Sequence, residues 1–183
     1  MENQLKFLLQ RFREDDQATM TVEFILILPV LMLWFIGSIV FFDAFDARAA
    51  AARTAHNIAD IMSRQTEAID DAYIDDLLLL QSRMLPREPA GELTVSALIR
   101  NADTGDMEVA WSYSTAGDPV VDADLAALTL PPMVLGETVL LVDSYVPFIP
   151  IADMVGIVAQ TWTNRVVISP RYLSFLPNLD RPV

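Results

Sequence analysis

Hydrophobic residues form one unbroken stretch near the start of the chain. The nineteen residues of 24–42 carry no charge, and the acidic residue Glu23 stands directly before them. A helix of that length measures roughly 28 Å, close to the ~30 Å hydrocarbon core of a bilayer. The stretch therefore predicts one membrane-spanning helix, which Pro29 and Gly37 interrupt. A carboxylate at its boundary is costly unless it is paired or hydrated, so Glu23 requires an explanation.

Two other origins of the apolar stretch fit less well. The hydrophobic part of a cleaved secretory signal is usually shorter than this run. The nearby small residues Ala47 and Ala49 flank Arg48, which is a poor context for signal cleavage. A core helix of a soluble protein would carry polar residues on one face, and this stretch carries apolar residues all round. A retained membrane helix remains the prediction.

Helical spacing continues beyond the apolar stretch. Residues 49–52 are four consecutive alanines, which have the highest helix propensity. Pro86 and Pro89 end the pattern. The sequence predicts helix over about 22–84, either as one long helix or as two in tandem. The apolar residues of its second part recur at intervals of three, four or seven: Ile58, Met62, Ile69, Tyr73, Leu77, Leu80 and Met84.

The period changes to two after Pro89. Alternation over 92–100 and again at Val109, Trp111 and Tyr113 predicts two strands, each with its apolar residues on one face. The segment 101–106 between them is rich in residues that tolerate a turn. We therefore expect an antiparallel hairpin here.

The rest of the chain predicts two more strands and little else. These strands are expected at 137–146, where Pro147 and Pro150 stop the first of them, and at 161–169. Residues 123–130 are expected as a short helix or loop, and the chain from Pro170 as extended coil. The fold class is α+β, with a long N-terminal helix packed on a small antiparallel sheet.

This pattern divides the chain into four parts. Residues 1–18 form a mixed-charge leader that we expect to lie in the cytoplasm, and residues 19–43 form the transmembrane helix. Residues 44–85 form an exported, amphipathic helical stalk. Residues 90–183 form a small antiparallel β domain with an extended C-terminal tail.

Composition excludes several classes of function. The chain of 183 residues has a net charge of −13, so it is a poor binder of nucleic acid. It has no cysteine, which rules out disulfides, thiolate metal sites and thiol catalysis. Basic residues flank the apolar stretch almost equally on both sides, so charge does not decide its orientation.

The junction before the apolar stretch offers a reason for Glu23. If a protease cuts between Ala18 and Thr19, Glu23 becomes the fifth residue of the product and Phe24 the sixth. The new α-amine then lies one helical turn from the glutamate. It could neutralise that carboxylate or the one on a neighbouring subunit. The competing interpretation of Glu23 is a solvated acid that marks the start of a helix.

This junction resembles the N-terminus of type IV prepilins. A polar leader, a small residue, four further residues, Glu23, the aromatic Phe24 and an apolar helix follow one another in the order of that class. The Glu-Phe pair is similar to that of the Flp subfamily. Chain length and outline resemble the TadE and TadF pseudopilins of the tight adherence (Tad) system. The segment 166–171 keeps only the Pro-Arg of the family's C-terminal element, and Ala18 replaces the glycine that the family prefers.

The resemblance implies a structural or assembly protein and no catalysis. It implies cleavage between Ala18 and Thr19 by an aspartic-type prepilin peptidase, and helix packing in assembly through Glu23 and Phe24. The implied partners are the membrane, the peptidase and other pilins or pseudopilins, with no cofactor, nucleic acid or small-molecule substrate. The implied location is the bacterial inner membrane, with the C-terminal domain in the periplasm. The resemblance does not distinguish TadE from TadF.

Two other functions stay open at this point. The first is a single-pass anchored periplasmic binding or sensory module that is never processed. The second is an anchored hydrolase that uses carboxylates alone, for which the sequence has no diagnostic motif.

Other candidate residues have simpler explanations. His56 is the sole histidine, so a multi-histidine metal site is excluded and a surface or packing role is expected. Asp43 and Asp46 are expected to mark the far membrane surface, or to meet an arginine such as Arg48 of a neighbouring subunit. The remaining acids predict a solvated helix face or turn chemistry, and the aromatic residues of the strands predict core packing. These are Asp70, Asp71, Asp75, Asp76, Asp103 and Asp106, and Trp111, Tyr113, Tyr145 and Trp162.

Overall fold

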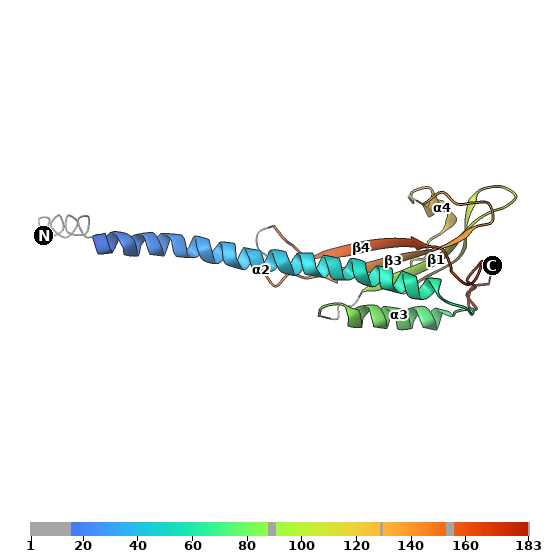
Figure 1. The fold of residues 1–183 in the computed structure, drawn as a ribbon, viewed down its shortest axis with the longest axis horizontal. Helices are drawn as coiled ribbons and strands as arrows, with labels where there is room; N and C mark the ends of the chain where they lie inside the picture. Colours follow the sequence, from blue (N-terminus) through green and yellow to red (C-terminus); the bar gives the residue numbers. More distant parts are fainter. Residues whose placement is uncertain (1–15, 88–90, 129, 153–155, 183) are drawn as a thin grey trace, which may run out of the picture.

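The protein is one long helix that packs, along its second half, on a small sheet (Figure 1). The computed structural model describes residues 16–87, 91–128, 130–152 and 156–182, with side chains from residue 20 onward. The predicted α+β class is confirmed. The elements in chain order are α2 (Asp16–Ser63), α3 (Asp71–Met84), β1 (Glu92–Arg100), β2 (Met107–Ser114), α4 (Asp122–Leu125), β3 (Thr138–Phe148) and β4 (Gln160–Ile168).

Helix α2 runs without a break through the apolar stretch and into the domain. Its 48 residues correspond to a length of about 72 Å. Pro29 lies inside the helix, and the helix continues beyond Gly37. The interruptions expected from these two residues therefore do not divide it.

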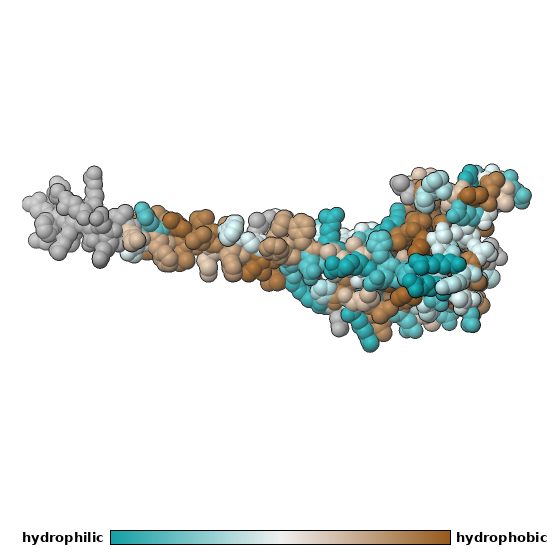
Figure 2. All heavy atoms as spheres, in the orientation of Figure 1, coloured by the Kyte–Doolittle hydropathy of each residue, from teal (hydrophilic) through white to brown (hydrophobic). Residues whose placement is uncertain are grey.

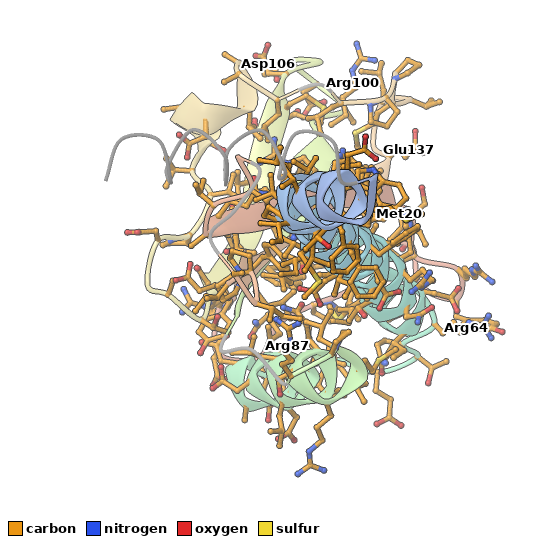
Figure 3. The ribbon with its side chains drawn as sticks, turned by 90° about the vertical axis from the view of Figure 1, so that its left-hand side faces the viewer. Met20, Arg64, Arg87, Arg100, Asp106 and Glu137 are labelled. Carbon is orange, nitrogen blue, oxygen red and sulfur yellow. The ribbon has the colours of Figure 1, made fainter. Side chains whose placement is uncertain are left out.

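The helical part of the chain is two helices rather than one. The break covers residues 64–70, after which α3 turns back along α2 (Figure 1). Asp70 caps α3 by accepting a 2.8 Å hydrogen bond from the backbone N–H of Tyr73. Viewed along α2 from its N-terminal end, α3 lies beside α2 at the bottom of the molecule (Figure 3).

Both helices cover one face of a four-stranded antiparallel sheet of order β2-β1-β3-β4. Three alanines of α2, Ala51, Ala55 and Ala59, are fully buried there. Their small side chains let the helix backbone lie close to the strands. The core between helices and sheet also contains further residues of α2 and residues of α3, β1, β3 and the tail, among them Ile58, Met62, Ile74, Leu93, Val95, Leu140, Val142 and Leu176.

The predicted hairpin is confirmed, but the prediction that Val109 lies on the same face as Trp111 was wrong. Strands β1 and β2 pair around a turn in which Asn101 accepts backbone hydrogen bonds at 2.9 and 3.2 Å. The register shifts between Ala97 and Leu98, which adds one residue to β2. Trp111 therefore faces the helices, whereas Val109 packs in a second cluster. A β-bulge inverts the alternation locally, and periodicity alone does not reveal it.

The prediction that Pro147 stops the third strand was also wrong. Strand β3 continues to Phe148, and Pro147 pairs with Thr161 of β4. Pairing of β3 with β1 ends at Tyr145. Because only one side of β3 is paired beyond that residue, the missing N–H of proline is tolerated there.

A smaller layer covers part of the other face of the sheet. Helix α4 and the following segment contribute Leu125 and Met133, which pack with Leu98, Val139 and Leu141. Figure 3 shows the labelled residues Arg100, Asp106 and Glu137 at the top, on the side away from α3.

Residues 170–182, the part of the C-terminal tail that the structure describes, form no helix or strand, as expected, but they are an integral part of the domain. Leu176 is 1% exposed, and its carbonyl accepts a 2.7 Å hydrogen bond from the indole N–H of Trp111. The backbone N–H of Arg171 donates to the carbonyl of Ser63 at 2.8 Å, and its guanidinium pairs with Asp60 at 2.7 Å. The Pro-Arg element thus holds the C-terminal end of α2, where a positive charge is favourable.

Gly91 lies where a side chain has no room. A Cβ atom at this position would approach the carbonyl oxygen of Tyr145 to 2.8 Å and the Nε2 atom of Gln81, which is fully buried, to 2.9 Å. We expect Gly91→Ala to lower the free energy of unfolding by about 1–3 kcal/mol, because backbone or core must shift to accommodate the methyl group. Urea unfolding of the full chain in detergent measures this, and an unchanged midpoint would contradict it.

Candidate functional site: the exposed half of the long helix

The first half of α2 is bare. Eighteen large apolar side chains between Met20 and Phe45 are exposed, including Phe24 at 62%, Trp34 at 71% and Phe42 at 74%. Figure 2 shows this half as a narrow hydrophobic rod beside a domain whose surface is mostly hydrophilic. Folded proteins rarely expose so large a continuous apolar surface to water. The rod must therefore be covered by lipid, by other helices, or by each in turn.

One helix among the described residues is long and apolar enough to cross a membrane, near the N-terminus. Within the apolar run the only hydroxyl side chain, that of Ser38, donates to the carbonyl of Trp34 at 2.8 Å. Its polar group is thus satisfied inside the helix, as the interior of a bilayer requires. Single-pass anchoring in a membrane agrees with these features.

The junction residues lie in the first turns of this helix. The Ala18–Thr19 bond falls in the first turn of α2, which begins at Asp16, and Glu23 follows Thr19 by four helical residues. Positions four apart lie on the same face of a helix. The side chains of Glu23 and Phe24 are exposed. Residues 1–15 of the predicted leader lie outside the described residues.

At the other end of the apolar stretch, an arginine of the same chain neutralises the first acid. Asp43 forms a salt bridge with Arg87, which follows α3. Arg87 also donates to the carbonyl of Ile149, at the end of β3, at 3.1 Å. Asp46 lies 3.9 Å from Arg53, and both side chains are exposed. Asp43 therefore has a partner within its own chain, and the predicted contact with a neighbouring subunit is not needed for it.

Arg87 is the residue of this candidate site that the sequence did not reveal. It lies 44 residues from Asp43 in the chain. The only signal near it in the sequence is Pro86, which indicates the end of a helix. Its backbone has φ = 66°, which few residues other than glycine adopt. Only the return of α3 along α2 brings it to the end of the apolar stretch.

A cavity of about 340 Å³ opens beside this salt bridge. Its walls come from α2, from the end of α3 and from the adjoining ends of β3 and β4. They are mostly apolar, and Asp43, Asp46 and Arg87 supply the charged groups that line the cavity. The apolar lining includes Ala47, Leu85, Val146, Phe148, Ile149 and Trp162.

The other candidate residues are explained by the fold. His56 is exposed on the outer face of α2. Asp71 binds Arg181 at 3.0 Å, and Asp75 accepts a 2.9 Å hydrogen bond from Tyr113, which raises the pKa of that phenol. Among the described residues no group of three or more potential metal ligands is present. We assign no catalytic chemistry to these positions.

One buried charge stands out on the face of the sheet opposite the helices. Asp143 of β3 is 1% exposed and accepts two hydrogen bonds from Arg165 of β4, at 2.7 and 2.8 Å. These bonds raise the pKa of Arg165 above its ordinary value, although partial burial opposes the shift. The pair joins an inner strand to an edge strand, so it acts in structure.

Comparison with known proteins adds no assignment. No protein-family model matches the chain, and no curated protein or solved structure matches it significantly.

Proposed function

We propose that this chain is a minor pseudopilin-type structural or assembly protein of a Flp (Tad) pilus or a related secretion system. A prepilin peptidase cuts it between Ala18 and Thr19. The bare helix then stores the subunit in the inner membrane and, after extraction, packs against the helices of other pilins or pseudopilins. Burial of the apolar surface is retained in both states, which makes the transfer feasible. The protein acts by binding its partners and performs no chemistry.

The single observation that carries this proposal is the division of α2 into two halves. Eighteen large apolar side chains between Met20 and Phe45 are exposed, whereas the half around Ala51, Ala55 and Ile58 contributes to the core of the domain. Because the helix is continuous, the exposed half is rigidly attached to the domain. This arrangement suits a subunit that contributes its helix to a bundle and its domain to the outside.

The same arrangement disfavours removal of the apolar stretch as a secretory signal. A signal peptidase would have to cut after the stretch, where Ala44 and Ala50 are buried against the domain. The proposed cut before Glu23 instead removes only the leader and leaves the whole apolar helix. The product is a membrane protein with a new N-terminus in the cytoplasm and its domain in the periplasm.

The spacing of Thr19 and Glu23 supports a role for the new amine. Since α2 is helical from Asp16, the amine of Thr19 and the carboxylate of Glu23 fall on the same face, one turn apart. In the apolar environment of a helix bundle, the two charges neutralise one another within a subunit or between subunits. Glu23 is the sole charged residue between Met20 and Phe42.

Intact-mass measurement of the protein extracted from its own membranes tests the proposal. We expect a chain that begins at Thr19, the product of cleavage after Ala18. Ala18→Gly should speed this processing, because glycine is the residue that the resembled family prefers, and Ala18→Phe should block it. Glu67→Ala, an exposed acid in the loop after α2, is the matched control and should be processed at the normal rate. A functional native protein that still begins at Met1 would contradict the proposal.

The second candidate is an unprocessed, membrane-anchored periplasmic binding or sensory module. The cavity of about 340 Å³ between α2, α3 and the sheet favours it, because apolar concave sites with few polar groups suit small ligands. This function needs neither cleavage after Ala18 nor the charge of Glu23. The intact mass therefore separates the two candidates.

A further inference from the structure

Apolar side chains gather at the end of the domain from which the bare half of α2 emerges. The connection between β3 and β4 carries Ile149, Ile151 and Val158, which are 73%, 65% and 54% exposed. In Figure 1 the described parts of this connection, residues 149–152 and 156–159, extend past the end of the sheet beside α2. These residues belong to the domain, so the membrane-spanning helix does not explain them.

The connection lies beside the last turns of the apolar stretch. A groove there is lined by Phe41, Ala44 and Phe45 of α2 together with Ile157 and Trp162. Val40 of the apolar stretch is 1% exposed, whereas its neighbours Ile39 and Phe41 are 46% and 54% exposed. The domain therefore begins to cover α2 before the apolar stretch has ended. If α2 spans a bilayer, this part of the domain lies at the level of the lipid headgroups.

The residues around the connection have the chemistry of a membrane interface. The guanidinium of Arg48 lies over the ring of Trp162, 5.6 Å from its centroid, and Phe148 lies 5.9 Å from the same ring. Tryptophan and the long basic side chains are enriched at this depth because each combines an apolar body with a polar end. Of the two acids at this level, Asp43 is neutralised by Arg87, and Asp46 lies 3.9 Å from Arg53.

Arg87 also holds the connection in place. Its guanidinium pairs with Asp43 of α2 and donates to the carbonyl of Ile149, the first residue after β3. One side chain thus joins the membrane helix, the end of α3 and the start of the connection.

We propose that the described parts of the β3–β4 connection, residues 149–152 and 156–159, enter the lipid interface and hold the domain against the membrane surface. The partner is the bilayer itself, and the apolar residues Ile149, Ile151 and Val158 make the contact. These residues extend the apolar surface of the spanning helix and fix the orientation of the domain before assembly. The inference rests on α2 crossing a membrane, and it holds whether or not the chain is cleaved after Ala18.

Because the sequence has no cysteine, single-cysteine variants of the full chain test the inference directly. Ile151→Cys and Val158→Cys report on the connection, and Leu31→Cys reports on insertion of α2. Val134→Cys is the matched control, since Val134 is 72% exposed and precedes β3 at the opposite end of the sheet. Each variant carries an environment-sensitive fluorophore and is reconstituted into phosphatidylcholine vesicles that contain nitroxide-labelled lipid.

We expect the fluorophores at positions 151 and 158 to lose fluorescence to the nitroxide lipid and to shift their emission to the blue. The fluorophore at position 134 should show neither change. If positions 151 and 158 behave like position 134 while position 31 is quenched, the domain stands away from the membrane and the inference is wrong. If position 31 is also unquenched, α2 is not inserted, and both the anchoring and this inference are contradicted.

Discussion

Replacing Glu23 with alanine is expected to leave cleavage after Ala18 and the fold of the domain intact, and to prevent assembly of the subunit. In the proposed bundle, the amine of Thr19 and the carboxylate of Glu23 neutralise one another in apolar surroundings. The variant keeps the amine and loses its partner. Breaking a buried ion pair costs about 3–5 kcal/mol, so incorporation should fall by a factor of about a hundred or more.

The measurement is the fraction of processed subunit that co-purifies with the assembled filament or with its membrane complex. Glu67→Ala removes an exposed acid outside the apolar stretch, and it should assemble like the unmodified protein. Glu23→Asp keeps the charge on a shorter side chain and should retain part of the assembly. Normal assembly of Glu23→Ala would remove the physical basis of the pseudopilin proposal. That result would not bear on the membrane helix or on the proposed contact between the β3–β4 connection and the bilayer.

Removing Arg165 should destabilise the domain more than removing Arg64, which forms an exposed ion pair with Asp60. Its partner Asp143 is 1% exposed and accepts both of its hydrogen bonds from Arg165. Arg165→Ala leaves a buried carboxylate without compensation, which should lower the free energy of unfolding by about 3 kcal/mol. Urea unfolding of the full chain in detergent, followed by far-ultraviolet circular dichroism, measures the change.

Two variants serve as controls for Arg165. Arg64→Ala removes an exposed arginine that pairs with Asp60 at 2.8 Å, and it should cost less than about 1 kcal/mol because solvent screens the pair. The double variant Asp143→Leu with Arg165→Met should recover most of the lost stability, since it removes both charges together. Equal stabilities of Arg165→Ala and Arg64→Ala would contradict this prediction.

Local sequence patterns predicted the helices and strands well where residues close together in the chain determine the secondary structure. The α+β class, the hairpin at Asn101 and strand β4 agree with periodicity and turn chemistry. The errors arise where contacts between distant segments prevail. The bulge in β2 places Val109 and Trp111 on opposite faces of the sheet. Strand β3 tolerates Pro147 because its pairing with β1 does not extend beyond Tyr145, which leaves that side of β3 unpaired. Neither fact can be read from one strand alone.

The break between α2 and α3 shows the same limit. Helical spacing continued through residues 64–70, so one long helix and two in tandem were equally compatible with it. The tail decides between them, because Ile69 donates to the carbonyl of Pro177 at 3.1 Å and Leu179 donates to Ile69 at 2.8 Å. These partners are more than 100 residues apart in the chain, and their hydrogen bonds stabilise the non-helical segment 64–70 between α2 and α3.

By itself, the sequence determined that this protein has an uncharged helix long enough to span a bilayer, with one acid at its start. Length, apolarity and the position of Glu23 are properties of consecutive residues, and no packing is needed to create them. Only the tertiary structure decided what stands at the other end of that helix. The Asp43–Arg87 pair and the apolar connection beside Phe41 join segments that are distant in the chain. Such contacts form only when the burial of a shared core compensates for the entropy of closing the chain between them.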